Sequence, residues 1–350
     1  MEYTKSRVEH TMDVEHPSHG DLTATARAHS NIALAKYWGK RDAALNIPAV
    51  GSISITLDGL HTDTTVSFHD DLEHDELWLN GALQGPDNAG MKRTRIVLNL
   101  VRDVVGTERH AVIRSANNFP TGAGLASSAS GFAALAVAAC AASGVTVTPR
   151  ELSILARRGS ASAARSLFGG YAELHAGTAT DGSDSFAEQL MDAADWPLSV
   201  VVAITDTSQK LVSSTEGMSA TSATSPFYTA WVDSSEALLA QMRAAILAND
   251  LEQVGELTEH SCLALHSLMF TTRPALIYWN AATMAAIHAV RELRAGGIPV
   301  YFTIDAGPQV KALCRPEEAS AVAQALSEVS GVHEARITGL CPAAHVMTAP

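Results

Sequence analysis

A strand, a glycine-rich loop and a helix of small residues follow one another between residues 110 and 144. The segment HAVIRSANNF alternates as a strand does, and the loop NNFPTGAGLASSASG holds three glycines, a proline and three serines. The helix that follows is rich in alanine and ends at Gly144. Because small side chains let a helix pack tightly against its neighbours, we expect this helix to be central and buried.

The loop has two interpretations. Its glycines allow the backbone to approach a ligand, successive N–H groups can form a nest for anions, and the helix N-terminus adds partial positive charge. Ser127 and Ser128 would then donate hydroxyls to phosphate oxygens or help to hold magnesium. The alternative is a plain turn with serine caps. The chain has no GxxxxGK[ST] sequence, so this is not a Walker loop, and the loop alone leaves the choice open.

The remaining periodicity predicts an α+β protein in which strands and helices are mixed rather than strictly alternating. Hairpins are expected over 51–68, with Asp58-Gly59 as the turn, and over 77–85. Residues 92–105 read as an amphipathic helix. We expect its apolar side to comprise Ile96, Val97, Leu100, Val101 and Val104. Further strands are expected at 23–34, 199–205, 299–305 and 333–340, and further helices at 225–249, 251–269, 280–295 and 316–330.

The length of 350 residues predicts two lobes. We place their boundary near residues 196 and 197, which gives a disordered extension over 1–21 and lobes over 22–197 and 198–350.

A formal net charge of −13 argues against a nucleic-acid partner, because a phosphate backbone needs a basic surface. The N-terminus lacks the apolar core of a signal peptide, and the most apolar stretch, 132–145, is too short to span a bilayer. These features predict that the protein has no membrane partner. Four scattered cysteines predict reduced thiols rather than a zinc site, so we expect a cytoplasmic protein.

The segment NIALAKYWGKRD crowds cations beside two aromatic residues in an acidic protein. Lys36 and Lys40 are four residues apart and would share a face in a helical turn. Two neighbouring ammonium groups repel each other unless an anion lies between them, and Tyr37 and Trp38 indicate a shaped pocket. The alternative is a solvated charge cluster.

Two further segments carry candidate chemistry. In RRGSASAARSLFGG, Ser160 and Ser162 precede Arg165, a pattern that suits a carboxylate or phosphate taken bidentately; the alternative is a capped helix with a surface arginine. In YFTIDAGPQV, Asp305 ends an apolar strand and reads as a base, as a group that orients a substrate hydroxyl, or as a capping aspartate. By itself, LVSSTEGMSATSATSPF reads only as a mobile loop.

Five blocks together are far more specific than any one of them: NIALAKYWGKRD, NNFPTGAGLASSASG, RRGSASAARSLFGG, VSSTEGM and FTIDAGP. Their order and spacing, over about residues 24–345, resemble the kinase superfamily of galactokinase, homoserine kinase and mevalonate kinase (the GHMP kinases), and within it the diphosphomevalonate decarboxylase family. The resemblance implies a two-lobed fold, with an N-terminal ATP-binding lobe like ribosomal protein S5 domain 2 and a ferredoxin-like C-terminal lobe.

The resemblance also implies the reaction. ATP, with Mg²⁺, would phosphorylate a tertiary hydroxyl of mevalonate 5-diphosphate, and loss of that phosphate and of carbon dioxide would give isopentenyl diphosphate. It implies no partner beyond this small molecule and a second copy of the chain in a homodimer.

The residues that the resemblance assigns fall into three groups. Asp305 would accept or orient the hydroxyl proton, Arg165 would hold the substrate carboxylate, and Lys36 would lie beside the transferred phosphoryl group. Other substrate contacts would come from Tyr37, Lys40, Ser160, Ser162, Ser214 and Met218. The ATP phosphates would lie against Asn118, Gly122, Gly124, Leu125, Ala126, Ser127 and Ser128. No protein side chain is expected as a fixed metal ligand, apart from a contribution by Ser127 or Ser128 to magnesium carried by ATP.

The chain departs from the family pattern at Gly51, Ala161, Ala164, Thr215 and Gln309. Some bacterial members carry, at the position of Thr215, an arginine that reaches the substrate diphosphate. Three alternatives therefore stay open: the same reaction on the 5-monophosphate, phosphorylation without decarboxylation, and a catalytically silent metabolite-binding relative. The presence of both Asp305 and Arg165 argues against the silent relative.

Overall fold

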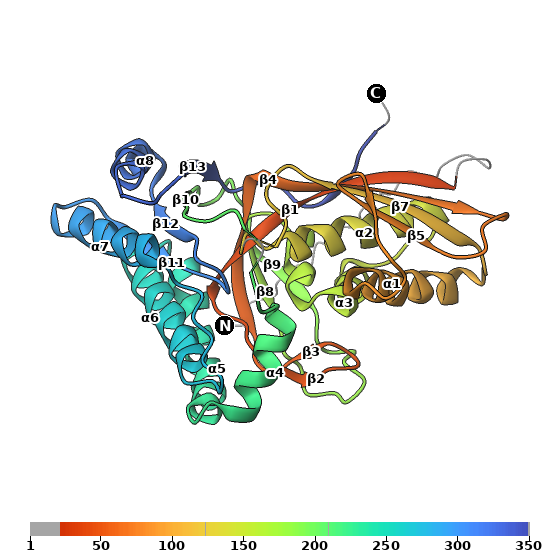
Figure 1. The fold of residues 1–350 in the computed structure, drawn as a ribbon, viewed down its shortest axis with the longest axis horizontal. Coiled ribbons are helices and arrows are strands. Elements are labelled where there is room, and N and C mark those ends of the chain that lie inside the picture. The colour runs from red at the N-terminus through yellow and green to blue at the C-terminus, as the bar shows by residue number, and fades with distance from the viewer. Residues whose placement is uncertain (1–21, 123, 209, 349–350) are drawn as a thin grey trace, which may run out of the picture.

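The computed structural model describes residues 22–122, 124–208 and 210–348, which form two sheets with helices packed on them (Figure 1). The first sheet has the order β14-β1-β4-β7-β5-β6, with β8 paired to β4 and β9 paired to β8. Its strands are β1 (Thr23–Ala35), β4 (Ser52–His69), β5 (Glu76–Leu79), β6 (Ala82–Leu83), β7 (His110–Asn117), β8 (Tyr171–Leu174), β9 (Ala187–Met191) and β14 (His345–Val346). A small pair, β2 (Lys40–Asp42) and β3 (Ile47–Pro48), lies apart from it.

Three helices and a 3-10 segment cover the first sheet on one side: α1 (Ala89–Val105), α2 (Ser127–Ser143), α3 (Pro149–Gly159) and η1 (Ala161–Leu167). Helix α2 lies directly against β1 and β4, and its alanines are buried from Ala129 to Ala142. The predicted central helix of small residues is therefore confirmed, and its C-terminus ends at Gly144 with φ +71°.

The second sheet is antiparallel, in the order β11-β12-β10-β13. Its strands are β10 (Ser199–Ile204), β11 (Val300–Thr303), β12 (Val310–Cys314) and β13 (Glu334–Gly339). The accompanying helices are α4 (Ser214–Thr224), α5 (Tyr228–Leu247), α6 (Leu251–Phe270), α7 (Ala281–Ala295), η2 (Pro316–Glu318) and α8 (Ala319–Ser327). Figure 1 shows α5, α6, α7 and α8 at the end of the molecule opposite α1–α3.

The two sheets share an apolar core. Ile32 of β1, Ile53 of β4, Val200 of β10 and Leu239 of α5 belong to one buried cluster. The chain also crosses back after the second sheet, because β14 pairs with β1 through Ala26 and Val346. This shared packing fixes the segments that follow β1 and β11, which carry the site. Within the described ranges, no helix is long and apolar enough to cross a membrane.

Two local predictions are corrected and a third is confirmed. Residues 52–69 form one long strand and not a hairpin, because Asp58 and Gly59 lie at an irregularity where Gly59 takes φ +76° and the register with β1 shifts. Helix α1 buries Leu98 and Arg102 beside Val97 and Val101, so its inner face is rotated from the predicted one. Ile96 and Val104 of that predicted face are exposed. The hairpin over 77–85 is confirmed as β5 and β6.

The segment 211–227 is also more ordered than a mobile loop. It contains α4, whose N-terminus is closed by a capping box between Ser213 and Glu216: the Ser213 hydroxyl accepts from the Glu216 amide, and the Glu216 carboxylate accepts from the Ser213 amide. The S-x-x-E pattern is the sequence signal for such a start.

Candidate active site

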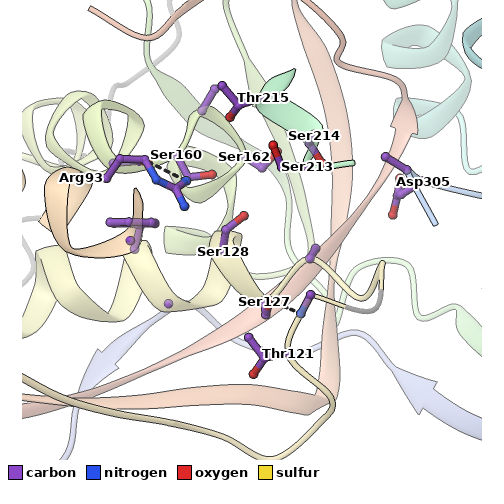
Figure 2. A pocket seen from close by; sticks show the side chains of 18 of the residues that line it. Arg93, Thr121, Ser127, Ser128, Ser160, Ser162, Ser213, Ser214, Thr215 and Asp305 are labelled. Atoms are coloured by element: carbon purple, nitrogen blue, oxygen red, sulfur yellow. Dashed lines mark hydrogen bonds between the residues drawn. The ribbon is translucent and has the colours of Figure 1, made fainter. Parts of the chain in front are cut away.

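A pocket of about 430 Å³ lies where the segment after β1, the glycine-rich loop, η1, α4 and the loop after β11 meet. Figure 2 shows Arg93 and Asp305 at opposite ends of it, with serines from the N-terminus of α2 and from η1 between them. Most of the predicted site residues line this pocket. They are Lys36, Tyr37, Lys40, Gly122, Gly124, Ala126, Ser127, Ser128, Ser160, Ser162, Arg165, Ser214, Met218 and Asp305.

Asp305 lies between two buried lysines. Lys36 Nζ is 2.7 Å from Asp305 Oδ1, and Lys311 Nζ is 3.4 Å from Asp305 Oδ2. Burial raises the pKa of the Asp305 carboxyl, but Lys36 and Lys311 together outweigh this effect and hold the pKa well below its ordinary value. Asp305 is therefore an ionised carboxylate at neutral pH, and the capping alternative is not needed to explain it.

The two lysines of the first cluster do not share a helical turn as predicted. β1 ends at Ala35, so Lys36 lies in an irregular segment, while Lys40 begins β2. Both nevertheless face the pocket. Burial, and to a smaller extent Arg93, lowers the pKa of Lys40. Lys36 is thus enclosed, whereas Lys40 is half-buried and Arg41 is exposed.

The glycine-rich loop turns tightly into α2. Gly122, Gly124 and Ala126 have φ values of +76°, +80° and +57°. Lys311 Nζ donates to the Gly124 carbonyl at 3.0 Å, which ties the loop to the Asp305 centre. Among the described residues, no side chain caps the N-terminus of α2, an arrangement that favours an anion at this helix end.

Two residues predicted in this loop do not line the pocket. The Asn118 side chain accepts from the His61 amide at 2.8 Å and donates to the Gly59 carbonyl at 2.8 Å. Leu125 is buried in the core, and its carbonyl accepts from Ser30 Oγ at 2.6 Å. These contacts hold the loop against β1 and β4, and the expected ATP contacts of Asn118 and Leu125 stay a prediction.

Arg165 is a buried cation and not a surface arginine. Its side chain donates to Ser52 Oγ and, at 3.1 Å, to Asn31 Oδ1, while its Nε has no hydrogen-bond partner among the described residues. Burial lowers the pKa of Arg165 to about 10, which leaves it charged at neutral pH. Within the part of the chain that is described, no carboxylate lies within ion-pair distance of it. A buried cation that lines a pocket without a carboxylate partner is suited to an anionic ligand.

Sequence reasoning missed two basic residues of the pocket. Lys210 Nζ donates to Ser214 Oγ at 2.8 Å and to the Ala306 carbonyl at 3.1 Å, and burial lowers its pKa to about 8. Arg93 of α1 lies 4.8 Å from the ring centre of Phe132, and its Nη1 donates to the Gly159 carbonyl at 3.4 Å. The serine-rich segment that follows Lys210 indicated only weakly that this residue lies in the pocket. Nothing in the sequence indicated this for Arg93, because it is one of several basic residues on an amphipathic helix.

The departures from the family pattern lie in different surroundings. Ala161 and Thr215 line the pocket, whereas Gln309 is buried and accepts from the Thr205 amide at 2.7 Å. At Gly51, a Cβ atom would lie 2.6 Å from Leu239 Cδ2, so α5 packs where a side chain would stand. Of these, only the changes at Ala161 and Thr215 can directly alter contacts with a ligand in the pocket.

The fold and the site together define a class. Two α+β lobes and a glycine-rich loop leading into a buried helix are consistent with a GHMP-type kinase fold, and solved structures of that fold match the chain. The two-lobed α+β prediction is thereby confirmed.

Two family models cover most of the chain. The diphosphomevalonate decarboxylase-like N-terminal domain matches residues 28–187, and the mevalonate 5-diphosphate decarboxylase C-terminal domain matches residues 200–344. The chain belongs to the diphosphomevalonate decarboxylase family.

Individual relatives agree with the family models. The diphosphomevalonate decarboxylase of Schizosaccharomyces pombe is 39% identical over 303 residues, 81% of this chain and 76% of the relative. The human one is 38% identical, with 81% and 74% covered. A structure of the Enterococcus faecalis mevalonate diphosphate decarboxylase matches with a TM-score of 0.85 at 39% identity, covering 94% of this chain and 100% of that one. Another structure, described as a complex with MVAPP, AMPPCP and magnesium, matches with a TM-score of 0.86 at 40% identity, with the same coverage.

Proposed function

We propose that this chain catalyses the ATP-dependent decarboxylation of mevalonate 5-diphosphate to isopentenyl diphosphate, ADP, phosphate and carbon dioxide. The observation that carries the proposal is the arrangement of Asp305 and Arg165 in one pocket, beside a loop suited to nucleotide phosphates. A kinase that only transferred phosphate would need the aspartate and the loop. The buried arginine without a carboxylate partner supplies the additional site that a substrate carboxylate requires.

Asp305 would act on the tertiary hydroxyl of the substrate. Its lowered pKa makes it a weak base, so its first role is to orient the hydroxyl and to receive its proton as the bond to phosphorus forms. A loose phosphoryl-transfer transition state does not require a stronger base, because positioning and charge stabilisation provide most of the catalysis. Lys36, held against Asp305, would face the transferred phosphoryl group.

The second half of the reaction breaks two bonds of the phosphorylated substrate. The C–O bond to the new phosphate breaks with its electrons leaving on phosphate, and the electrons of the bond to the carboxyl carbon form the double bond of the product as carbon dioxide departs. Arg165 would orient the carboxylate for this alignment. Binding it too tightly would oppose loss of carbon dioxide, so its contribution is mainly orientation.

The residues present fit ATP and magnesium. The glycine-rich loop, the uncapped start of α2 and Lys210 would contact the ATP phosphates, with Ser127 and Ser128 at the first turn. Magnesium bound with ATP would neutralise phosphate charge. The opposite end of the pocket contains Arg93 and Lys40, two cations remote from Asp305 that are suited to the diphosphate of the substrate. Their presence favours the diphosphate over the monophosphate.

We also propose that the lobes divide near residue 197 and that the enzyme acts as a homodimer in the cytoplasm. The four cysteines are free and buried, which suits a reducing compartment. Sedimentation of the purified chain tests the dimer.

The substrate is tested by offering mevalonate, its 5-phosphate and its 5-diphosphate separately, with ATP and magnesium. The proposal expects kcat/KM to be highest by far for the 5-diphosphate. A higher value for the 5-monophosphate would reassign the substrate.

A further inference from the structure

Two adjacent side chains of α6 contact the backbone on both sides of the Lys36–Asp305 pair. Ser261 Oγ accepts from the Lys36 amide at 2.9 Å. Cys262 Sγ accepts from the Ile304 amide at 3.2 Å and lies 3.6 Å from the Ile304 carbonyl oxygen. Ser261 is 3% exposed and Cys262 is 0% exposed, so these contacts are shielded from water.

Both backbone amides lie just beyond a strand. β1 ends at Ala35 and its last pairing with β4 is at that residue, while β11 ends at Thr303. Past the end of a ladder, a buried N–H group needs another acceptor, and leaving it without one destabilises the folded chain. The two α6 side chains supply these acceptors for the residues that precede or carry the charged pair.

Helix α6 also contacts β11 two residues before Ile304, at Phe302. β11 is an edge strand of the second sheet, with β12 as its neighbour. Glu259 Oε1 accepts from the Phe302 amide at 3.0 Å and pairs with Arg294 Nη1 at 2.7 Å. The amides of Phe302 and Ile304 are therefore both bound by α6, through Glu259 and Cys262. This double attachment fixes the direction in which the strand leads to Asp305.

We propose that Ser261 and Cys262 are positioning residues that set the separation of Lys36 and Asp305. Lys36 follows a strand of the first sheet and Asp305 a strand of the second, so a single helix that contacts both segments determines how closely their side chains approach. The inference rests on the proposed function, because it concerns the same charged pair. It adds a role to a thiol and a hydroxyl that touch neither the pocket nor the ligand sites described above.

Three variants separate positioning from packing. Cys262→Ala removes the acceptor, Cys262→Ser keeps an acceptor in a smaller side chain, and Cys314→Ala removes an equally buried thiol at the end of β12. Each is assayed with mevalonate 5-diphosphate, ATP and magnesium for kcat, both KM values and Tm. Ser261→Ala repeats the test from the side of Lys36.

The inference expects Cys262→Ala and Ser261→Ala each to lower kcat by about 10- to 100-fold with nearly unchanged KM, as misplaced catalytic groups do. Cys262→Ser should recover most of the lost kcat despite a lowered Tm, and Cys314→Ala should lower Tm with kcat near that of the unaltered chain. The inference is overturned if Cys262→Ala matches Cys314→Ala in kcat, or if Cys262→Ser is as impaired as Cys262→Ala. An unaltered chain that releases no carbon dioxide would instead overturn the proposed function.

Discussion

Lys36 Nζ donates to Asp305 Oδ1 at 2.7 Å, although the two residues are 269 positions apart in the chain. The contact joins the segment after β1 to the segment after β11, so it forms only when both sheets are in place. It keeps Asp305 ionised, and it brings a cation to the point where phosphoryl charge would develop. The proposed chemistry depends on this one contact more than on any other.

Replacing the carboxylate tests its role directly. Asp305→Asn removes the proton acceptor and keeps the side chain's size, so turnover should fall by roughly 10²- to 10⁴-fold. Binding of ATP and substrate, measured by titration calorimetry, should stay near that of the unaltered chain. Turnover close to the unaltered value would remove Asp305 from the mechanism.

Arg165→Lys tests the carboxylate contact. An ammonium group cannot reproduce the planar fork that reaches Ser52 and Asn31, so kcat should fall by about 100-fold through misorientation. Arg243→Lys is the matched control, because Arg243 pairs with Glu173 outside the pocket. If Arg165→Lys kept most of its activity while folding normally, the carboxylate role would be wrong.

The pH dependence of ATP use should report Lys210. Burial lowers its pKa to about 8, with Asp305 opposing this shift and Lys311 adding to it. The charged form is present below that pH, so kcat/KM for ATP should decline as the pH rises through about 8. Lys210→Arg keeps the charge at higher pH and should move the decline upward. A pH profile that is identical in Lys210→Arg would exclude Lys210 as the group responsible.

The glycine-rich loop should not tolerate a side chain at Gly124, where it packs against the segment that follows Asp305. At Gly124, with φ +80°, a Cβ atom would lie 2.9 Å from Gly307 Cα. Gly124→Ala should therefore displace the loop and raise KM for ATP. Gly81→Ala shares the strained backbone, with φ +81°, but meets no atom within 4 Å. It should lower Tm and leave KM for ATP unchanged, and an equal KM effect in both variants would contradict the assignment of the loop.

The fold was predictable where local chemistry agreed with the tertiary structure. The alanine-rich helix after the glycine loop is an example, because small residues define both its packing and its burial. The prediction failed at Asp58-Gly59, where a sequence typical of a tight turn instead forms an irregularity inside a strand that is held by pairing with β1 and β7. Such pairing is decided by distant residues.

The site was predictable in its motif residues and not in its supporting residues. Asp305, Arg165 and Ser160 lie in compact segments whose order can be compared with a family. Arg93 lies in no such segment and reaches the pocket only because α1 packs beside α2 and α3. The hydrogen bond from the Lys36 amide to Ser261 likewise could not be predicted from the sequence, because 225 positions separate the two residues.

The most direct test of the account is the ratio of carbon dioxide to ADP formed from mevalonate 5-diphosphate with limiting ATP and magnesium. A decarboxylase in which Asp305 and Arg165 act on one substrate should form the two products in equal amounts throughout the reaction. Formation of ADP without carbon dioxide would show that the chain transfers phosphate only, and it would contradict the role proposed for Arg165.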